Sequence, residues 1–368
     1  MIFVKIMIVK ARAQILVPEI KKPVKIDLND RKILKCLEVN SRLSLTTIAK
    51  KVKLSKEVVF HRIKNLVNKG IIVDFYTAFN TDKFNFQRYE ILFKLKAIKK
   101  DERENFINYL IEHPFVSWIM GYGGKYDFLV EICSKNVEHF QSVLFEIINS
   151  FQEIIYDYEI SMALTRYHSS MKYLDTEKIS LNLDFKRDKE AFSDDFNKSK
   201  IEKIDLDKKD FEILDLLDDN ARYSFAELSR KLRISRDTIK YKIKKMIGGN
   251  FIKGFQLRLN QYLLGFQAAT LFLRLGVLSR EEEEKIVDFL ISQPLINVIV
   301  KRIGQHGNYS AEIYFRDNYE LDRLINSIKE EMGEKLIGSE VIIQFSQYKF
   351  TYLPEGILEH LKENLTNN

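Results

Sequence analysis

The sequence is poor in the features that mark secreted and membrane-spanning proteins. It holds only two cysteines, Cys36 and Cys133, and both stand among apolar neighbours, which predicts buried thiols rather than a disulfide. No apolar run reaches the roughly 18 residues that a membrane-spanning helix needs. Residues 1–26 form an apolar N-terminal extension, but lysines and an arginine interrupt it and no cleavage site follows. We interpret this extension as an extra strand or a mis-assigned start, and we expect a cytoplasmic protein.

Catalytic signatures are missing as well. The segment GYGGKY lacks the spacing of a phosphate-binding loop and the Ser or Thr that follows its lysine, and no G-x-S-x-G motif occurs. The six histidines have no metal-ligand spacing with each other or with cysteine. These absences favour a binding protein over an enzyme, and one without a metal or a cofactor.

Positive charge is concentrated in two short segments. The chain of 368 residues has a net charge of +7. Residues 50–69 hold seven lysines or arginines against one glutamate, and residues 230–249 hold eight against one aspartate. The rest of the chain is therefore mildly acidic. Two basic patches on an acidic body predict a polyanionic partner that is bound at two places.

An internal repeat explains why there are two patches. Asp30–Phe75 aligns without a gap on Asp210–Phe255, at an offset of 180 residues. Further on, a slippage of three residues aligns Tyr126 with Tyr309 and places Ser310 at the position of Asp127. The duplication covers roughly 28–167 and 206–352, which predicts two copies of one structural unit.

The first part of each unit has the pattern of a winged helix-turn-helix. Asp30 is placed to cap a first helix, and Ser44 and Ser55 are placed to cap a second and a third. Gly70 should end the third helix, and a strand over 71–76 should form the wing. Asn250 replaces this glycine in the second copy and also tolerates the left-handed conformation.

The second part of each unit alternates strand and helix patterns. The order is β-α-β-β-α-β, which is the ferredoxin-like arrangement of an antiparallel sheet with both helices on one face. In the first copy we expect these elements at 89–97, 102–112, 116–119, 128–133, 137–151 and 154–166. The fold class is therefore α+β, as a tandem repeat of a winged helix-turn-helix and a ferredoxin-like domain.

The predicted domains follow from the repeat. After the N-terminal extension at 1–26 we expect winged helix-turn-helix domains at 27–80 and 204–260, ferredoxin-like domains at 81–167 and 261–353, a polar linker at 168–203 with one strand at 179–185, and a C-terminal tail at 354–368.

The third helix of each unit is the candidate for insertion into the major groove of double-stranded DNA, since its inner face is apolar and its outer face is polar or basic. Candidates for reading bases are Lys56, Glu57, Phe60, Arg236, Asp237 and Lys240. Candidates for phosphate contacts are Ser55, Arg62, Lys64, Ser235, Lys242 and Lys244. His61 and Tyr241 lie on the same faces, although a single exposed histidine is weak support for a role.

These residues resemble the Lrp/AsnC family of leucine-responsive, "feast/famine" transcription regulators. The resemblance rests on the helix-turn-helix with its Asn40-x-Arg42 pair, which recurs as Asn220-x-Arg222, and on the segment GGKYD. It implies sheets that pair into dimers. Most members carry one unit per chain, so this chain either supplies both halves of a dimer as a pseudo-dimer or assembles as a homo-oligomer. The two third helices differ, so we expect an asymmetric DNA site.

The resemblance also implies an effector site. It would place an amino acid or a related metabolite at the turn of Gly123, Gly124, Tyr126 and Asp127, with Asp127 facing the ammonium group. The alternative is that these glycines serve only the shape of a strand–strand turn.

Two other functions remain open at this stage. Siroheme decarboxylases share the domain organisation, but they carry a histidine-asparagine-tyrosine motif with a nearby arginine, which neither SWIMGYGGKYDF nor IVKRIGQHGNYSAEI matches. An interaction protein with degenerate helix-turn-helix units would be expected to lose its basic charge, and both copies keep it.

Overall fold

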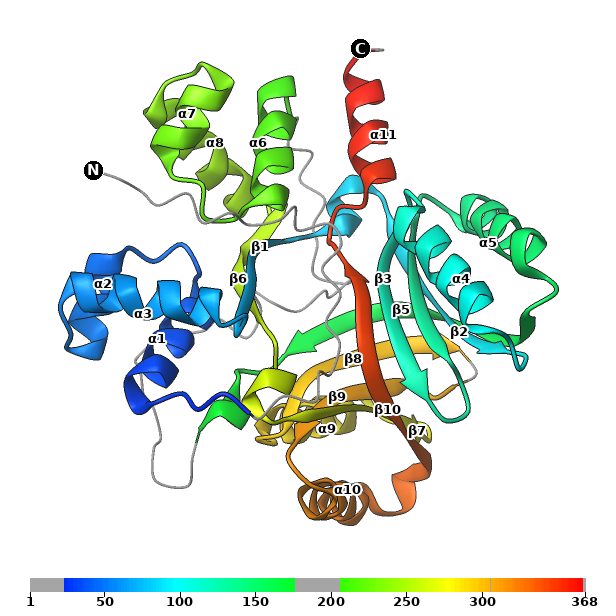
Figure 1. Ribbon diagram of the computed structural model, residues 1–368. Coiled ribbons are helices and arrows are strands. Elements are labelled where there is room, and N and C mark those ends of the chain that lie inside the picture. Colours follow the sequence, from blue (N-terminus) through cyan, green and yellow to red (C-terminus); the bar gives the residue numbers. More distant parts are fainter. Residues whose placement is uncertain (1–22, 176–205, 305, 367–368) are drawn as a thin grey trace.

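Each unit opens with the three helices that the sequence predicts (Figure 1). The computed structural model describes residues 23–175, 206–304 and 306–366, so the extension over 1–22 and the predicted strand at 179–185 lie outside the described residues. None of the described helices is long and apolar enough to cross a membrane. The helices of the two helix-turn-helix units are α1 (Leu28–Val39), α2 (Leu45–Val52), α3 (Lys56–Asn68), α6 (Lys208–Asp219), α7 (Phe225–Leu232) and α8 (Arg236–Gly248).

The first helix begins earlier than predicted, because Asp27 and not Asp30 is its N-cap. The Asp27 carboxylate accepts the backbone N–H of Asp30 at 2.8 Å, and the Asp30 carboxylate accepts that of Asp27 at 3.3 Å. This reciprocal pair is a capping box, which satisfies two backbone donors at once. Ser44 and Ser55 cap α2 and α3 as predicted.

The strand after each third helix does not fold back as a wing within its own unit. Instead β1 (Ile72–Phe79) and β6 (Ile252–Leu259) pair antiparallel with each other, with Thr77 opposite Phe255. The strand predicted over 71–76 is therefore present, and its partner, which the sequence did not identify, belongs to the other copy. The two helix-turn-helix units are thereby joined by one two-stranded sheet.

The remainder of each unit is ferredoxin-like, as predicted. The first contains β2 (Gln87–Leu95), α4 (Lys100–Glu112), β3 (Val116–Gly123), β4 (Phe128–Ser134), α5 (Val137–Phe151) and β5 (Ile155–His168). The second contains β7 (Gln267–Leu275), α9 (Arg280–Ser292), β8 (Ile296–Gly304), β9 (Tyr309–Phe315), α10 (Asn318–Met332) and β10 (Leu336–Phe350). Short 3-10 helices lie at Thr81–Phe84, Lys172–Leu174, Tyr262–Leu264 and Gly333–Lys335.

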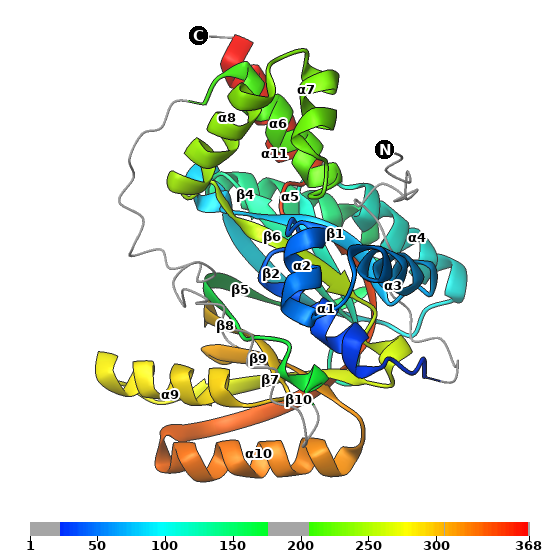
Figure 2. The same ribbon diagram turned by 90° about the vertical axis from the view of Figure 1, so that its left-hand side faces the viewer.

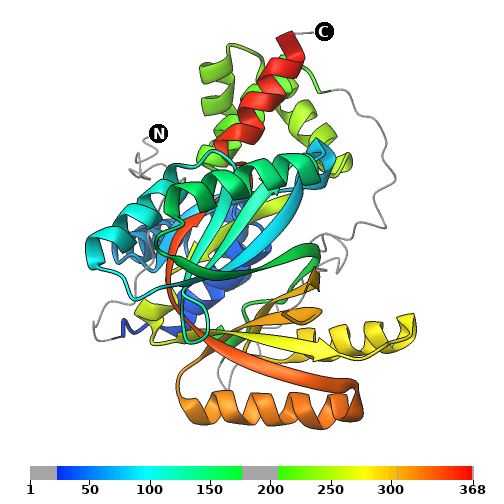
Figure 3. The same ribbon diagram turned by 90° about the vertical axis from the view of Figure 1, so that its right-hand side faces the viewer.

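The two four-stranded sheets close on each other. Their orders are β5-β2-β4-β3 and β10-β7-β9-β8, and the seams are formed by the pairs β5–β8 and β10–β3. Figures 2 and 3 show the helices on the outside of this closed sheet. Apolar cores lie between the sheet and the helices, around Phe106 and Val143 in one unit and Leu290 and Leu324 in the other. The pairing that is expected between chains of a dimer thus occurs within this chain.

The register of the sheet corrects the alignment of the two copies. Phe128 pairs with Phe93, and Tyr309 pairs with Leu273, 180 residues after Phe93. Tyr309 is therefore the counterpart of Phe128 and not of Tyr126. The counterpart of Asp127 is Asn308 rather than Ser310, because the second hairpin has one residue more between the bonded residues Arg302 and Asn308 than the first has between Tyr122 and Asp127.

Two predicted boundaries also change. The segment after β5 is packed up to Asp175, since Tyr173 and Leu174 are buried and the backbone N–H of Ser169 donates to Asn297 at 2.8 Å. The predicted C-terminal tail is a helix, α11 (Glu355–Thr366), which buries Ile357 and lies against α6. Both cysteines are buried and free, as predicted.

Candidate nucleic-acid interface and central cavity

The outer face of α3 is exposed, as the sequence predicts. Ser55, Lys56, Glu57 and His61 are exposed, and Phe60, Arg62 and Lys64 are half-buried. The inner face buries Val59, Ile63 and Leu66 in the apolar core. The Ser55 side chain accepts the backbone N–H of Val58 at 3.2 Å and so caps α3. The capped N-terminal turn faces solvent.

The outer face of α8 is exposed in the same way. Arg236, Asp237, Lys240, Tyr241 and Lys244 are exposed, and the Tyr241 side chain has 68% of its surface accessible. Ser235 is exposed and caps the helix by accepting the backbone N–H of Thr238 at 3.0 Å. Neither third helix is therefore covered by the described part of the chain.

Arg62 and Lys242 differ from the other candidates because each is held by carboxylates of its own unit. Arg62 Nη1 lies 2.7 Å from Asp27 Oδ2 and 2.8 Å from Asp30 Oδ1. Lys242 makes the same two contacts with the equivalent aspartates, Asp207 and Asp210. These bonds raise the pKa of Arg62 and tie the third helix to the cap of the first. This arrangement favours an internal role for both side chains over a phosphate contact.

Two arginines clamp the helix-turn-helix units together across a pseudo-two-fold axis. Arg42 Nη1 donates to the backbone oxygen of Ala221, and Arg222 Nη1 donates to that of Ser41. Burial lowers the pKa of Arg42 to about 10, but the guanidinium stays charged at neutral pH. These are the arginines of the repeated Asn-x-Arg pair, so a motif that suggested the family also performs the pairing.

Two side chains of the GGKYD turn, Tyr126 and Asp127, make internal contacts. Asp127 Oδ2 accepts the backbone N–H of Leu95 at 2.9 Å and lies 3.2 Å from Lys94 Nζ. Tyr126 is buried and its hydroxyl donates to Glu159. Asn308 repeats the bond of Asp127 in the second unit, accepting the N–H of Leu275 at 2.8 Å. The turn therefore braces the sheet, and both of these Asp127 contacts use the same carboxylate oxygen, Oδ2.

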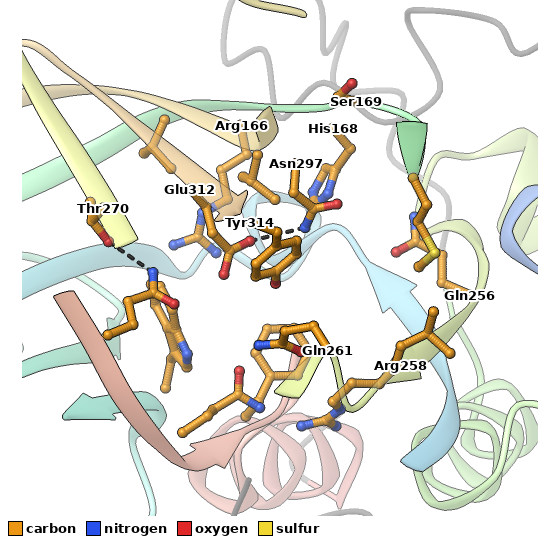
Figure 4. A pocket seen from close by; sticks show the side chains of 18 of the residues that line it. Arg166, His168, Ser169, Gln256, Arg258, Gln261, Thr270, Asn297, Glu312 and Tyr314 are labelled. Atoms are coloured by element: carbon orange, nitrogen blue, oxygen red, sulfur yellow. Dashed lines mark hydrogen bonds between the residues drawn. The ribbon is translucent and has the colours of Figure 1, made fainter. Parts of the chain in front are cut away.

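A cavity of about 160 Å³ lies where the inner face of the closed sheet meets the β1–β6 pair. Figure 4 shows Arg166, Glu312 and Tyr314 from the closed sheet on one side and Arg258 from β6 on another. Its lining therefore combines both ferredoxin-like sheets with the strands that carry the helix-turn-helix units.

Charged residues cross the inner face of the closed sheet beside this cavity. Arg166 Nη2 lies 3.4 Å from Glu90 Oε1 and also contacts Glu131. Arg302 Nη2 lies 3.0 Å from Glu90 Oε2, so Glu90 joins arginines from both units. Burial lowers the pKa of Arg166 to about 10, which still leaves it charged at neutral pH.

None of these buried charged residues was predicted from the sequence. A signal was present, because Glu131 and Glu312 each interrupt an apolar strand, in FLVEICS and YSAEIYF. A carboxylate inside such a strand is rarely buried without a partner, so the pattern predicts partners on neighbouring strands. The identity of those partners depends on the register, which the sequence alone did not reveal.

Comparison with known proteins agrees with the helix-turn-helix geometry. A family model described as winged helix-turn-helix DNA-binding matches residues 26–73 and 206–253. The regulator Ptr1 of Methanocaldococcus jannaschii is 32% identical over 106 residues, which cover 29% of this chain and 68% of Ptr1. The regulator LrpA of Pyrococcus horikoshii is 28% identical over 145 residues, which cover 38% of this chain and 97% of LrpA.

Over its whole length the fold is similar to that of the siroheme decarboxylase NirDL. The TM-score is 0.58 at 13% identity, with 92% of this chain and 98% of that chain covered. At this identity the likeness concerns the fold alone, whereas the regulators share sequence as well. The chain therefore belongs to the Lrp/AsnC family of helix-turn-helix transcription regulators, of which it carries two tandem units.

Proposed function

We propose that the chain binds double-stranded DNA as an intramolecular pseudo-dimer and regulates transcription. The observation that carries this proposal is that α3 and α8 both present exposed N-terminal turns and basic outer faces from units that are fastened to each other. In a helix-turn-helix protein, these turns reach base edges while neighbouring cations contact phosphates.

The two helices would read different half-sites. Lys56, Glu57 and Phe60 of α3 correspond to Arg236, Asp237 and Lys240 of α8, so one face is partly aromatic and the other is more basic. A homodimer reads a palindrome because its two reading helices are identical. This chain should instead prefer two dissimilar half-sites about 34–36 Å apart, or a multiple of that distance.

Sequencing of genomic fragments retained by the full chain tests the proposal. We expect enrichment of an asymmetric motif, with an affinity that falls on the order of 10³-fold or more between 50 and 200 mM salt if eight to ten phosphates are contacted. Retention without a shared motif, or with a perfect palindrome, would contradict the asymmetric reading.

An amino-acid effector at the GGKYD turn is a weaker part of the proposal. Asp127 Oδ2 already accepts the backbone N–H of Leu95 and lies 3.2 Å from Lys94 Nζ, so an ammonium group would have to use Oδ1 or displace Lys94. Isothermal titration with a panel of amino acids tests this site. Heat that disappears in an Asp127→Asn variant would support it, and no heat with any amino acid would leave a bracing turn.

A decarboxylase acting on siroheme is the second candidate, and the whole-chain likeness to NirDL favours it. NirDL has been crystallised in co-complex with an iron-uroporphyrin III analogue. The cavity here, at about 160 Å³, is close to the roughly 150 Å³ that holds one benzene ring and far below the needs of a tetrapyrrole. Incubation with siroheme separates the candidates, since release of CO₂ and a changed product mass would establish the enzyme.

A further inference from the structure

The residues that line the central cavity have more buried hydrogen-bond donors without a partner than acceptors. Among its lining residues, buried nitrogens without a hydrogen-bond partner are Arg302 Nε and Nη1, Arg258 Nη1, Trp118 Nε1 and Gln347 Nε2. The lining residues contribute one such oxygen, Gln344 Oε1. Buried polar groups are nearly always paired in folded proteins, so this imbalance points to a ligand that supplies acceptors.

The two arginines are held in place by bonds that leave these donors free. The Arg302 side chain is 2% exposed, and its Nη2 donates to Ser310 Oγ at 2.5 Å while lying 3.0 Å from Glu90. The Arg258 side chain is 10% exposed, and its Nε and Nη2 donate to the two oxygens of Asp74 at 3.3 and 2.7 Å. Orientation by protein partners is what a preformed carboxylate site requires.

The walls of the cavity suit an aromatic body. Tyr76, Trp118, Tyr314 and Phe350 line it, and the Arg258 guanidinium lies 4.7 Å from the centre of the Phe350 ring. The volume of about 160 Å³ matches a single ring, because a cavity of roughly 150 Å³ binds benzene. A ligand of this size would touch both the sheet and the β1–β6 pair.

Glu312 is a carboxyl group in the lining of the cavity. Burial raises the pKa of this group and so favours its neutral form. Asn297 Nδ2 donates to Glu312 Oε2 at 2.9 Å, which occupies one of its oxygens. Protonation of Glu312 would remove the negative charge that this side chain presents to a carboxylate.

We propose that the central cavity binds a small carboxylate carrying one aromatic ring, with its oxygens on the free N–H groups of Arg302 and Arg258. Because Arg258 and its neighbours on β6 line the cavity, occupancy would also bias the arrangement of the helix-turn-helix units. This second part rests on the proposed DNA-binding function.

Trp118 provides a direct readout, since it is the only tryptophan in the chain and it lines the cavity. Titration of the full chain with phenylacetate should give a saturable change in tryptophan emission, and phenylacetamide, which lacks the charge, should give little. Absence of any saturable change or titration heat with phenylacetate, benzoate and phenylpyruvate at millimolar concentration would overturn the proposal.

Two further ligands test the chemical class. Phenylalanine carries the ammonium group that phenylpyruvate lacks, so we expect it to bind more weakly than phenylpyruvate. Tighter binding of phenylalanine would contradict the proposal that the ligand supplies only hydrogen-bond acceptors. Uroporphyrin III should not alter the Trp118 emission, and a saturable change with it but not with the one-ring acids would overturn the assigned size.

Variants locate the site. Arg302→Gln should weaken phenylacetate binding about tenfold or more, because it removes a charged donor, and Gln347→Leu, which leaves every buried ion pair intact, should weaken it about threefold or more. Lys301→Gln is the matched control, since Lys301 is the neighbour of Arg302 on β8, pairs with Glu283 and does not line the cavity. Unchanged affinity in both Arg302→Gln and Gln347→Leu would overturn the proposal.

The coupling is tested separately on DNA. Saturating phenylacetate should change the affinity for the retained genomic fragments at least threefold, and it should do so less in Gln347→Leu. If phenylacetate binds but the chain retains no DNA, the proposed function and the coupling are both wrong, and the ligand site in the cavity stands. DNA affinity that phenylacetate leaves unchanged would overturn the coupling alone.

Discussion

Tyr122 and Arg302 occupy equivalent positions in the two units, and each reaches across to the equivalent strand of the other unit. The Tyr122 hydroxyl lies 2.9 Å from Thr270 Oγ1, and Arg302 Nη2 lies 3.0 Å from Glu90 Oε2. Thr270 stands 180 residues after Glu90, so the duplicated geometry carries a neutral pair on one side and an ion pair on the other. A homodimer of identical chains cannot hold such an asymmetric interior, and fusion of two units permits it.

The arginine clamp between the helix-turn-helix units should contribute measurably to stability. Arg42→Ala removes a charged donor from the Ala221 carbonyl and packing on Phe225 and Phe255, so we expect a loss of about 1.5–3 kcal/mol in the free energy of unfolding. Urea unfolding measures this loss. Arg236→Ala is the control, since Arg236 is exposed and should change stability by less than about 0.5 kcal/mol. Equal effects of the two variants would contradict the clamp.

Lys240 and Lys244 lie one turn apart on α8 and should behave differently on DNA. Lys240→Ala should weaken the base preference at one position of the site. We expect it to cost about 1–3 kcal/mol of binding free energy on DNA that carries the preferred base there. Lys244→Ala should weaken binding to all sequences alike and reduce the salt slope by about 1. Binding titrations on the selected site and on single-base variants, at several salt concentrations, distinguish the two. A uniform loss in both variants would mean that neither lysine reads a base.

Making the reading residues identical should make the preferred site symmetric. The triple substitution Lys56→Arg, Glu57→Asp and Phe60→Lys gives α3 the three candidate reading residues of α8. Selection from random DNA should then yield two more similar half-sites at an unchanged spacing. The matched reverse triple, Arg236→Lys, Asp237→Glu and Lys240→Phe, should also raise the symmetry but shift the base preference. Half-sites that stay dissimilar in both variants would place the reading elsewhere.

Buried histidines should make the fold weaker in mild acid. Burial lowers the pKa of His113, His139 and His306, so these rings take up protons at a lower pH in the folded chain than in the unfolded chain, whose histidines titrate near pH 6.5. Their contribution is fully present above that pH and is lost as the pH falls below it. Unfolding in urea at pH 7.5 and pH 5.5 should show the loss. His139→Gln should reduce the difference between the two pH values, and an unchanged difference would contradict this contribution.

The two strand turns should differ in their tolerance of alanine. Gly307 has φ +90°, and an added Cβ would lie 2.6 Å from the carbonyl oxygen of Leu273. Gly124 has φ +133° but nothing within 4 Å of an added Cβ. Both variants suffer the unfavourable backbone conformation, of about 1–2 kcal/mol, and only Gly307→Ala adds a clash with backbone. The melting temperature of Gly307→Ala should therefore be lower than that of Gly124→Ala. The reverse order would contradict the register of this turn.

Local patterns in the sequence predicted the elements well. The periodicity of Val59, Ile63 and Leu66 identified α3, and the predicted helix over 137–151 matches α5. Such features depend on neighbouring residues, so they can be read along the chain. The cap of α1 was misassigned to Asp30 because both members of its capping box are aspartates, and either could fill the first position.

Contacts between distant residues could not be read in this way. Pairing of β1 with β6, the closure of the sheet and the partners of Glu90 join residues that lie far apart in the sequence. A one-residue difference in the turn before Tyr309 also shifts which side chains are equivalent, and residue types alone did not reveal it.

The sequence by itself determined that this protein has two similar units, each with a basic third helix and a ferredoxin-like domain, because repeats and periodicities are local properties. Only the tertiary structure decided that the units pair within one chain and enclose a cavity rich in free donors. The physical reason is that register and strand partners are chosen by the packing of the whole sheet, and a shift of one residue would turn Arg302 and Glu90 away from each other.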